Sequence, residues 1–335
     1  MTKASLILEQ LARNSRAELA DAHCSHPEIY WNEEIAATEE KTIFRRDWVC
    51  PGLAAEIPEL GDYMTYSVAG EPVFTIRGKN NKIKTYSNIC RHRMMALLVG
   101  TGNTSRIVCP YHAWTYSLSG QLIAAPHMER STGFEKRKIQ LKEIKTEIWN
   151  GWIYITLNRE APSMKESLVP LEEIVSPYGM ENYVPVLKEE NIWKTNWKLL
   201  TENFMEGYHL PVAHKKTVGA WFKLEDTKFP QKTYDTFTFQ TFVKTGKATY
   251  GKAHRDNNRL SGKWRNTSIL PTIFPSHMYV LAPDHLWYLT LRPLGVGEVD
   301  VRFGVAIAPE VDAVLKNKKE RAEWISNLTA FFDHV

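Results

Sequence analysis

The feature that most constrains this chain is a Cys-x-His motif that starts at Cys90, followed after sixteen residues by a Cys-Pro-Tyr-His motif that ends at His112. Two thiolates and two imidazoles can bind a zinc ion or a two-iron, two-sulfide cluster. Zinc motifs usually place two or more residues inside each pair, whereas only one separates Cys90 from His92. The spacing favours an iron-sulfur cluster, with Cys90 and Cys109 on one iron and His92 and His112 on the other.

Composition places the chain among ordinary globular proteins. It has 335 residues, enough for two domains, and 43% of them are hydrophobic. The sequence contains no apolar run of about 18 residues, so it predicts no membrane span. The acidic Glu9 comes too early for a signal peptide, and we expect a cytoplasmic protein. The net charge of +4 is too small to indicate a nucleic-acid partner. Cys24 and Cys50 lie outside the motifs and are expected to be ordinary thiols.

A second candidate site lies near the end of a helix that the apolar spacing predicts to begin at Trp193. At about 100° per residue, Glu206 and His209 share one helical face, whereas His209 and His214 would lie about 140° apart. Pro211 removes a backbone donor and should end or kink the helix, which would let His214 turn back toward His209. Two histidines and a carboxylate form the ligand set of non-haem Fe(II) oxygenases. Isolated histidines, however, are more often hydrogen-bonded core or surface residues.

Through these motifs the chain resembles the Rieske non-haem iron oxygenases, in their large (alpha) subunit, along nearly its whole length. The family pattern is Cys-x-His-Arg-Gly followed by Cys-Pro-Tyr-His-Gly-Trp. This chain keeps the four ligands and Trp114, but Met94 and Ala113 replace the two glycines. We expect the added side chains to change the loop geometry and the redox properties of the cluster without removing a ligand.

The resemblance also implies roles at the second site. The family motif is an acidic residue, two residues, His, four residues and His, which Glu206, His209 and His214 match. It implies that the two histidines bind a mononuclear iron. Glu206 would not bind this iron but would connect His209 to a cluster histidine, expected to be His112, of a neighbouring subunit. Asn203 would lie near the iron, with a helix-capping or other structural role as the alternative.

The third iron ligand of the family is an Asp on a late helix. The last helix of this chain has an apolar stripe formed by Trp324, Ile325, Leu328, Phe331, Phe332 and Val335. Asp333 falls on the opposite side of that helix and should face water. We therefore expect the true ligand to lie beyond Val335 and the chain to be a shortened view of the subunit.

The predicted elements, together with the resemblance, give an α+β fold class with three parts. A helical arm at residues 1–43 is expected to pack on the catalytic domain. Short β-rich runs separated by Gly and Asn turns predict an all-β Rieske [2Fe-2S] domain at residues 44–157. Residues 158–335 are expected to form the mononuclear-iron domain, in which helices cover an antiparallel sheet in a helix-grip, START-like arrangement. Within it we expect a mobile loop at 214–265 and a terminal helix from 311 onward.

The resemblance implies the terminal oxygenase component of a multicomponent system, which activates O₂ at a mononuclear Fe(II) with electrons relayed from a Rieske [2Fe-2S] cluster. The chain has no Gly-x-Gly-x-x-Gly motif, so NAD(P)H is expected to act through a separate reductase, with or without a ferredoxin. A relay between subunits predicts a cyclic homotrimer. The alternative from another class is an electron-transfer iron-sulfur protein in which His209 and His214 are structural.

Glutamate rather than aspartate at position 206 is similar to the carnitine, glycine-betaine and choline monooxygenase branch of the family. It favours hydroxylation or N-dealkylation of a small quaternary ammonium compound, with hydroxylation of an aromatic ring as the alternative. Aromatic walls can hold either a flat ring or a quaternary ammonium group. The side chains expected near the pocket are Phe204, Tyr208, Phe274, His277, Tyr279 and Trp287.

Overall fold

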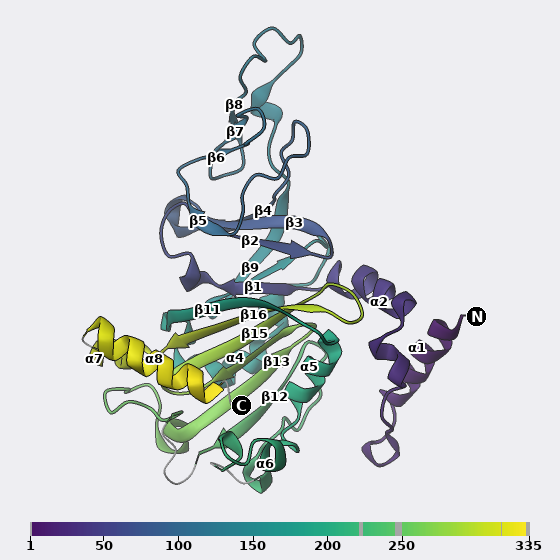
Figure 1. Cartoon of the computed structure of the whole chain (residues 1–335), viewed down its shortest axis with the longest axis vertical. Coiled ribbons are helices and arrows are strands. Elements are labelled where there is room, and N and C mark those ends of the chain that lie inside the picture. The colour runs from purple at the N-terminus through teal and green to yellow at the C-terminus, as the bar shows by residue number, and fades with distance from the viewer. Residues whose placement is uncertain (1, 221–223, 245–249, 316, 333–335) are drawn as a thin grey trace. The chain divides into compact units, whose positions relative to one another are not determined.

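The computed structural model describes residues 2–220, 224–244, 250–315 and 317–332, which belong to two units. One unit is Phe44–Val169, and the other combines Met1–Ile43 with Pro170–Val335 (Figure 1). Within the described residues, no helix is both long enough and apolar enough to cross a membrane.

The unit Phe44–Val169 is built from antiparallel strands, as the sequence predicts. Seven strands form a sheet in the order β1-β10-β9-β4-β3-β2-β5, and three short strands form a second sheet in the order β6-β7-β8, toward the tip of this unit in Figure 1. The bounds are β1 Val49–Leu53, β2 Asp62–Val68, β3 Glu71–Arg77, β4 Ile83–Ser87, β5 Thr101–Asn103, β6 Ile107–Val108, β7 Thr115–Tyr116, β8 Leu122–Ala124, β9 Glu143–Trp149 and β10 Trp152–Thr156. Short helical turns are η4 Ala54–Glu56, η5 Lys79–Asn81, η6 Lys136–Lys138 and α3 Met164–Ser167.

One apolar cluster of this unit holds the loops between its strands. Phe74 and Tyr86 on the large sheet pack together with Tyr116 on the small sheet, and the same buried cluster contains Cys90 and Cys109. Removal of these aromatic side chains from water stabilises the packing between the two sheets. The cysteine-bearing loops are therefore fixed against the core of the unit.

The unit extends to Val169 rather than ending at residue 157, where the sequence places its boundary. The reason is a contact between the turn after β10 and β9. Ser163 caps α3 and donates to Oε2 of Glu147 at 3.0 Å, and the same oxygen accepts from the backbone N–H of Lys165 at 3.1 Å. These hydrogen bonds tie α3 to the sheet.

The other unit contains a six-stranded antiparallel sheet with helices, which confirms the predicted helix-over-sheet fold. The strand order is β11-β16-β15-β14-β13-β12. The strands are β11 Val184–Trp193, β12 Phe237–Val243, β13 Thr267–Ile273, β14 His277–Leu281, β15 His285–Pro293 and β16 Val299–Ile307. The helices after the boundary are α4 Val169–Val175, η7 Ser176–Tyr178, η8 Met180–Asn182, α5 Trp197–Met205, α6 Leu210–Ala213, η9 Val218–Ala220, η10 Leu224–Asp226, η11 Gly262–Asn266, α7 Pro309–Val314 and α8 Lys318–Phe332. Helix α5 contacts β12, β13 and β15.

Three predictions about these elements are wrong. Trp193 does not begin a helix but ends β11, where it pairs with Val299 of β16, because strand pairing overrides its helix-compatible spacing. Helix α5 begins instead at Trp197. The side chain of Asn196 caps this helix, because it accepts a hydrogen bond from the N–H of Lys198 at 3.0 Å. The expected loop at 214–265 contains β12, which pairs with β13 along its whole length. The expected single terminal helix is divided into α7 and α8.

The arm at the start of the chain contains α1 Lys3–Asn14, η1 Leu19–Asp21, η2 Pro27–Tyr30, α2 Glu33–Glu39 and η3 Glu40–Phe44. Its carboxylate Glu39 binds Lys198 of α5 at 2.7 and 2.8 Å and accepts from Nε1 of Trp197 at 3.1 Å. Tyr30 donates its hydroxyl to Glu202 at 2.6 Å. The Lys198–Glu39 pair is nearly buried, with side chains 11% and 12% exposed, so the contacts between the arm and α5 are largely shielded from water.

Candidate metal centres and active-site cavity

The four side chains of the two Cys-His motifs meet on the loops that lead into β5 and β7. Cys90 and Cys109 are 2% and 3% exposed, whereas His92 and His112 are exposed. The two imidazole rings have centroids 4.9 Å apart and lie at 68° to each other. Two buried thiols beneath two exposed imidazoles fit a [2Fe-2S] cluster, in which each iron takes two protein ligands. Within the described part of the chain, no three His, Cys, Asp or Glu side chains are grouped to hold one ion.

The two loops have matching backbone geometry. The carbonyl of Cys90 accepts from the N–H of Met94 at 3.1 Å, and the carbonyl of Cys109 accepts from the N–H of Ala113 at 3.0 Å. Met94 and Ala113 have φ angles of 57° and 56°, the left-handed region that glycine adopts most easily. The backbone therefore keeps a conformation that glycine favours, and the added side chains project outward, with Met94 84% exposed.

Aromatic groups and backbone donors surround these ligands. The buried Trp114 stacks on His92, with centroids 4.6 Å apart and planes at 8°, and Tyr111 contacts His112 at 3.8 Å between centroids. Burial raises the pKa of the Cys109 thiol, while the backbone N–H groups of Tyr111 and His112 hydrogen-bond it and oppose that shift. Such donors stabilise a thiolate bound to metal.

The second site is formed where α5 ends, although not as one continuous helix. Helix α5 stops at Met205, and Glu206 has an extended backbone with φ −119° and ψ 153°. His209 and His214 flank the short α6 at its two ends, and Pro211 lies in its first turn, where a missing N–H is tolerated. The expected shared helical face of Glu206 and His209, and the expected break at Pro211, are therefore wrong.

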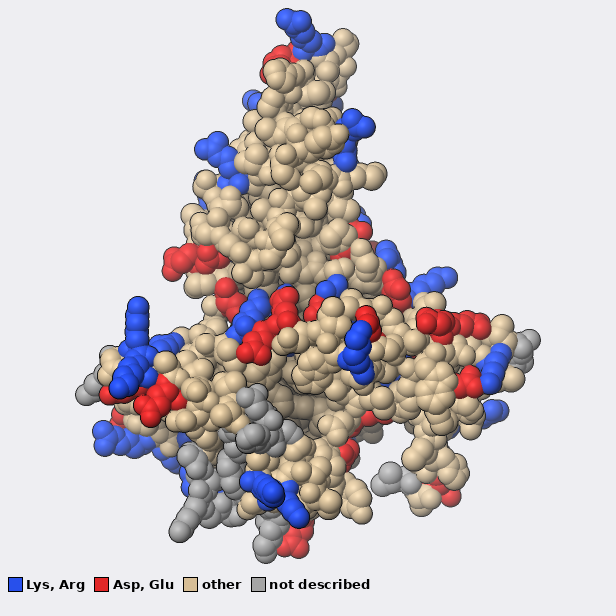
Figure 2. Space-filling view, in the orientation of Figure 1, with Lys and Arg blue, Asp and Glu red and all other residues tan. Residues whose placement is uncertain are grey.

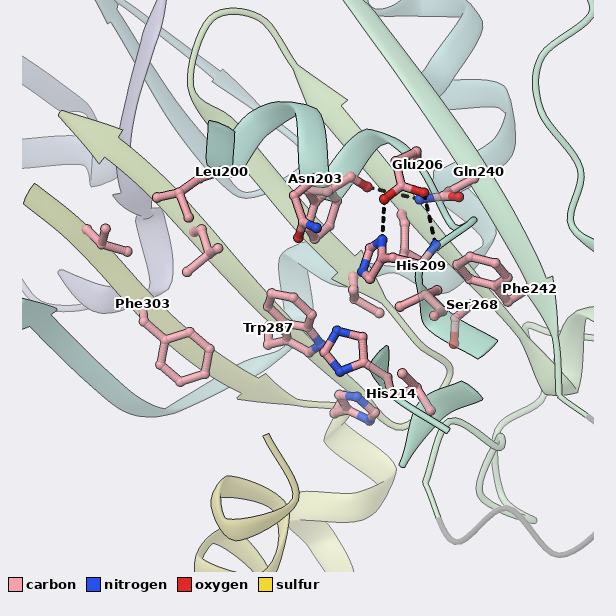
Figure 3. A pocket seen from close by; sticks show the side chains of 18 of the residues that line it. Leu200, Asn203, Glu206, His209, His214, Gln240, Phe242, Ser268, Trp287 and Phe303 are labelled. Carbon is pink, nitrogen blue, oxygen red and sulfur yellow. Dashed lines mark hydrogen bonds and ion pairs between the residues drawn. The ribbon is translucent and has the colours of Figure 1, made fainter. Parts of the chain in front are cut away.

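The side chains nevertheless converge, as Figure 3 shows. Oε1 of Glu206 contacts Nδ1 of His209, and Oε2 accepts from the backbone N–H groups of Tyr208 and His209, the latter at 3.2 Å. The rings of His209 and His214 have centroids 5.2 Å apart at 71°. Since Nδ1 of His209 faces Glu206, its Nε2 is the atom suited to bind a metal. Burial, and then the charge of His209, lower the pKa of His214, which favours the neutral form that a metal ligand needs.

A cavity of about 400 Å³ adjoins the two histidines. All six strands of the sheet contribute to its walls, together with α5, α6 and α8. Asn203 lies inside α5 and lines the cavity, while Asn196 caps that helix, so the capping alternative for Asn203 is wrong. Gln240 supports the end of α5, because its side chain donates to the carbonyl of Phe204 at 2.9 Å.

The expected pocket walls are only partly found. Trp287 and Phe204 line the cavity, with their rings in an edge contact at 5.7 Å. His277 and Tyr279 do not line it, because they face the side of β14 opposite to Val280, which does. Tyr208 and Phe274 are exposed instead.

Sequence reasoning missed a set of cavity residues at the strand ends. Glu189, Asn191 and Trp193 alternate along β11 and all line the cavity, a period-2 pattern whose last residue had been assigned to a helix. Lys244 and His285 also line it, although they are far apart in the sequence.

Helix α8 borders the cavity through Thr329. Of its predicted apolar stripe, Leu328 is buried and Trp324 and Ile325 are half-buried. Asp333 and Val335 lie outside the described residues, so the position of the third iron ligand stays a prediction.

Two family models match the chain: the Rieske [2Fe-2S] domain over residues 47–145, and the ring hydroxylating alpha subunit (catalytic domain) over residues 180–335. The glycine betaine monooxygenase oxygenase subunit of Chromohalobacter salexigens is 33% identical over 212 residues, which cover 62% of this chain and 47% of that protein. The carnitine monooxygenase oxygenase subunit of Acinetobacter baumannii is 27% identical over 239 residues, covering 67% and 62%. The chain thus spans about half the length of the first of these relatives.

The fold is similar to that of a solved quaternary ammonium Rieske monooxygenase studied for carnitine oxidation and inter-subunit electron transfer. The TM-score is 0.76 at 22% identity, and the match covers 92% of this chain and 81% of that chain.

Proposed function

The chain belongs to the Rieske non-haem iron oxygenases, as a large (alpha) subunit, and on this premise we propose that it is the terminal oxygenase component of a multicomponent system. The observation that carries the proposal is the pair of donor sets in one chain. Cys90, His92, Cys109 and His112 would hold the [2Fe-2S] cluster, and His209 and His214 would hold the mononuclear iron. When bound, these groups supply one-electron transfer and O₂ activation at an open iron site.

Glu206 is proposed to position His209 and to link the two sites between subunits. Its carboxylate contacts Nδ1 of His209, yet its side chain is still 44% exposed. His112 is exposed as well. A neighbouring copy could therefore bring its cluster histidine to Glu206, and head-to-tail contacts of this kind close into a cyclic homotrimer.

The surface around the cluster histidines supports such an interface. Met94, Met95, Val108 and Tyr111 on these loops are large apolar side chains that are 84%, 42%, 44% and 55% exposed. Figure 2 shows few charged side chains over much of the visible face of this unit. Exposed apolar groups of this size favour burial against another protein surface.

Electrons are proposed to come from NAD(P)H through a separate reductase, with or without a ferredoxin, in the cytoplasm. The sequence contains no Gly-x-Gly-x-x-Gly nucleotide motif. The exposed His92 and His112 give a partner protein access to the cluster ligands.

The substrate is proposed to be a small quaternary ammonium compound, which would be hydroxylated or N-dealkylated. Trp287 contacts both Phe204 and Phe303, at 5.7 and 6.3 Å between centroids, so the cavity has a continuous aromatic wall. Glu189 adds a carboxylate to the same cavity. Aromatic faces and a carboxylate attract a cation that cannot donate a hydrogen bond, and each cation-π contact contributes about 0.5 to 2 kcal/mol.

Iron analysis and O₂ consumption test this proposal. With a surrogate reductase and NADH, we expect three irons per chain and O₂ uptake that depends on glycine betaine, carnitine or choline. O₂ uptake with benzoate-like acids alone would indicate that the reaction is ring hydroxylation of an aromatic acid instead. Two irons per chain without turnover would instead support the electron-transfer protein.

A further inference from the structure

The cavity has a polar corner made by Lys244 and His285, which the roles described above do not use. We propose that this corner binds the carboxylate of a zwitterionic substrate, with the Lys244 ammonium as its charge partner and His285 as a second hydrogen-bonding group. Asp284 positions both. The inference rests on the proposed function, because it adds an anionic group to the quaternary ammonium substrate.

Asp284 is a buried anchor for this corner. It is 7% exposed, its two carboxylate oxygens accept from the N–H of Gly251 at 2.9 and 2.8 Å, and Oδ1 lies 2.7 Å from Nδ1 of His285. Burial acts to raise the pKa of Asp284, but His285, Lys244 and the Gly251 N–H together hold it below its usual value. Asp284 is therefore an ionised group that orients its neighbours.

Lys244 lies directly over Gly251. A Cβ atom at position 251 would clash with the end of the Lys244 side chain, and Gly251 has a φ of 83°. This backbone conformation favours glycine. The ammonium donates to the carbonyl of Tyr250 at 3.2 Å. These contacts place the ammonium beside Gly251 and Tyr250.

The cationic residue of this corner borders the cavity, whereas its buried carboxylate does not. Lys244 and His285 line the cavity, whereas Asp284 does not. Burial lowers the pKa of Lys244 to about 8, against the opposing effect of Asp284, so the ammonium form still predominates at pH 7. Because Nδ1 of His285 is directed to Asp284, the orientation of this ring at the cavity wall is held by a buried carboxylate.

The corner stands at one end of the aromatic wall. Along β15, His285 is followed by Trp287 and then Leu289, which pairs with Phe303 of β16. These steps of two residues place all three side chains on one face of the strand, each step about 7 Å further along it. A ligand with its ammonium against Trp287 and Phe303 would thus extend its carboxylate toward Lys244.

Binding measurements with three ligands test the contributions of the cationic and the anionic group separately. Glycine betaine carries both, choline carries only the cation, and 3,3-dimethylbutanoate is the betaine shape with only the anion. In Lys244→Met, we expect the dissociation constants of the two carboxylates to rise about ten- to a hundredfold, because a charged hydrogen bond is lost, while that of choline is unchanged. Lys319→Met, at an exposed position on α8, is the matched control. Equal changes for choline and the carboxylates, or none, would overturn the proposal.

The parent protein provides a test that does not depend on the folding of a variant. It should bind 3,3-dimethylbutanoate at least about tenfold more tightly than the uncharged 3,3-dimethylbutanol. Equal affinity would exclude an anion site. If the carboxylate binds selectively but glycine betaine and choline do not, the anion site stands and the quaternary ammonium assignment fails. Iron content is measured in every sample, because a carboxylate also binds iron directly.

Discussion

The hydroxyl oxygen of Tyr116 lies 3.3 Å from Sγ of Cys90 and 3.0 Å from the backbone N of Arg91, which donates to it. A thiolate sulfur can only accept, so the Tyr116 hydroxyl would donate its proton to Cys90 when this residue binds the cluster. Burial raises the pKa of Tyr116, and the neighbouring Cys90 adds to this effect, so the phenol remains a donor. A donor to a cluster sulfur stabilises the more negative, reduced state.

Tyr116→Phe should lower the reduction potential of the cluster. A hydrogen bond to a charged group contributes about 1.5 to 3 kcal/mol, and 59 mV corresponds to a tenfold change in a one-electron equilibrium, so we expect a decrease of about 65 to 130 mV. The measurement is a redox titration followed by EPR. Tyr111→Phe is the control, because Tyr111 packs on His112 with its ring and is 55% exposed. An unchanged reduction potential in Tyr116→Phe would show that the hydroxyl does not influence the cluster.

The left-handed backbone at Met94 and Ala113 gives a prediction about stability. A left-handed conformation costs about 1 to 2 kcal/mol at a residue with a Cβ atom, while glycine adds about 0.4 to 1 kcal/mol of entropy to the unfolded chain. Met94→Gly and Ala113→Gly should each leave the melting temperature of the cluster-loaded protein unchanged or raise it by a few degrees, about 2 to 4 °C per kcal/mol.

Ala96→Gly is the matched control for these two variants. Ala96 lies in the same loop region but is not among the residues with positive φ. Glycine at this position should therefore lower the melting temperature, since only the entropy of the unfolded chain changes. A decrease of the same size in Met94→Gly would show that left-handed strain is not relieved there.

The proposed cluster ligands were assigned from the sequence because their pattern is local. Two of these residues lie within 90–92 and two within 109–112, so the spacing alone indicates that two sulfur and two nitrogen atoms can bind one cluster. The motif predicted that Glu206, His209 and His214 lie close together, which they do, but their local structure was predicted wrongly. Glu206 and His209 meet across a turn in which the carboxylate also accepts backbone N–H groups, an arrangement that helical periodicity does not describe.

The polar corner of the cavity could not be predicted, because its parts come from distant strand ends. Lys244 follows β12 and His285 begins β15, and only the pairing of β12, β13, β14 and β15 brings them to one cavity. The orientation of His277 was missed for a related reason. A one-residue difference in strand register moves a side chain to the other face of a sheet, and apolar composition does not reveal which face is buried by helices.

His277 gives a prediction about acid stability. Burial lowers its pKa to about 3, from an ordinary value of 6.5. The unfolded chain therefore binds a proton below pH 6.5 that the folded protein does not accept until about pH 3, and stability is lost as the pH falls through this range. The slope from this group is about 1.4 kcal/mol per pH unit.

His277→Phe should reduce this loss. The variant keeps a flat ring beside Tyr279, which stacks on His277 at 5.2 Å between centroids. Thermal unfolding at pH 7.5 and pH 5 is the measurement, and the decrease in melting temperature should be smaller in the variant than in the parent. His23→Gln, at an exposed position, should behave like the parent. Identical decreases in all three proteins would exclude His277 as the source.

The last prediction separates two roles for Glu206, as an iron ligand and as a positioning and electron-transfer residue. Its contact with Nδ1 of His209 orients the ring, whereas Nε2 of His209 is left to bind metal. Glu206→Gln should thus retain the mononuclear iron and a normal cluster spectrum, while substrate-dependent O₂ uptake falls by about 10- to 100-fold or more. Glu206→Asp, which keeps a carboxylate on a shorter side chain, should restore part of the activity. Glu202→Gln, one turn earlier on α5 and bonded to Tyr30, is the control and should keep its turnover. Loss of the mononuclear iron from Glu206→Gln would show that the carboxylate is needed for metal binding itself.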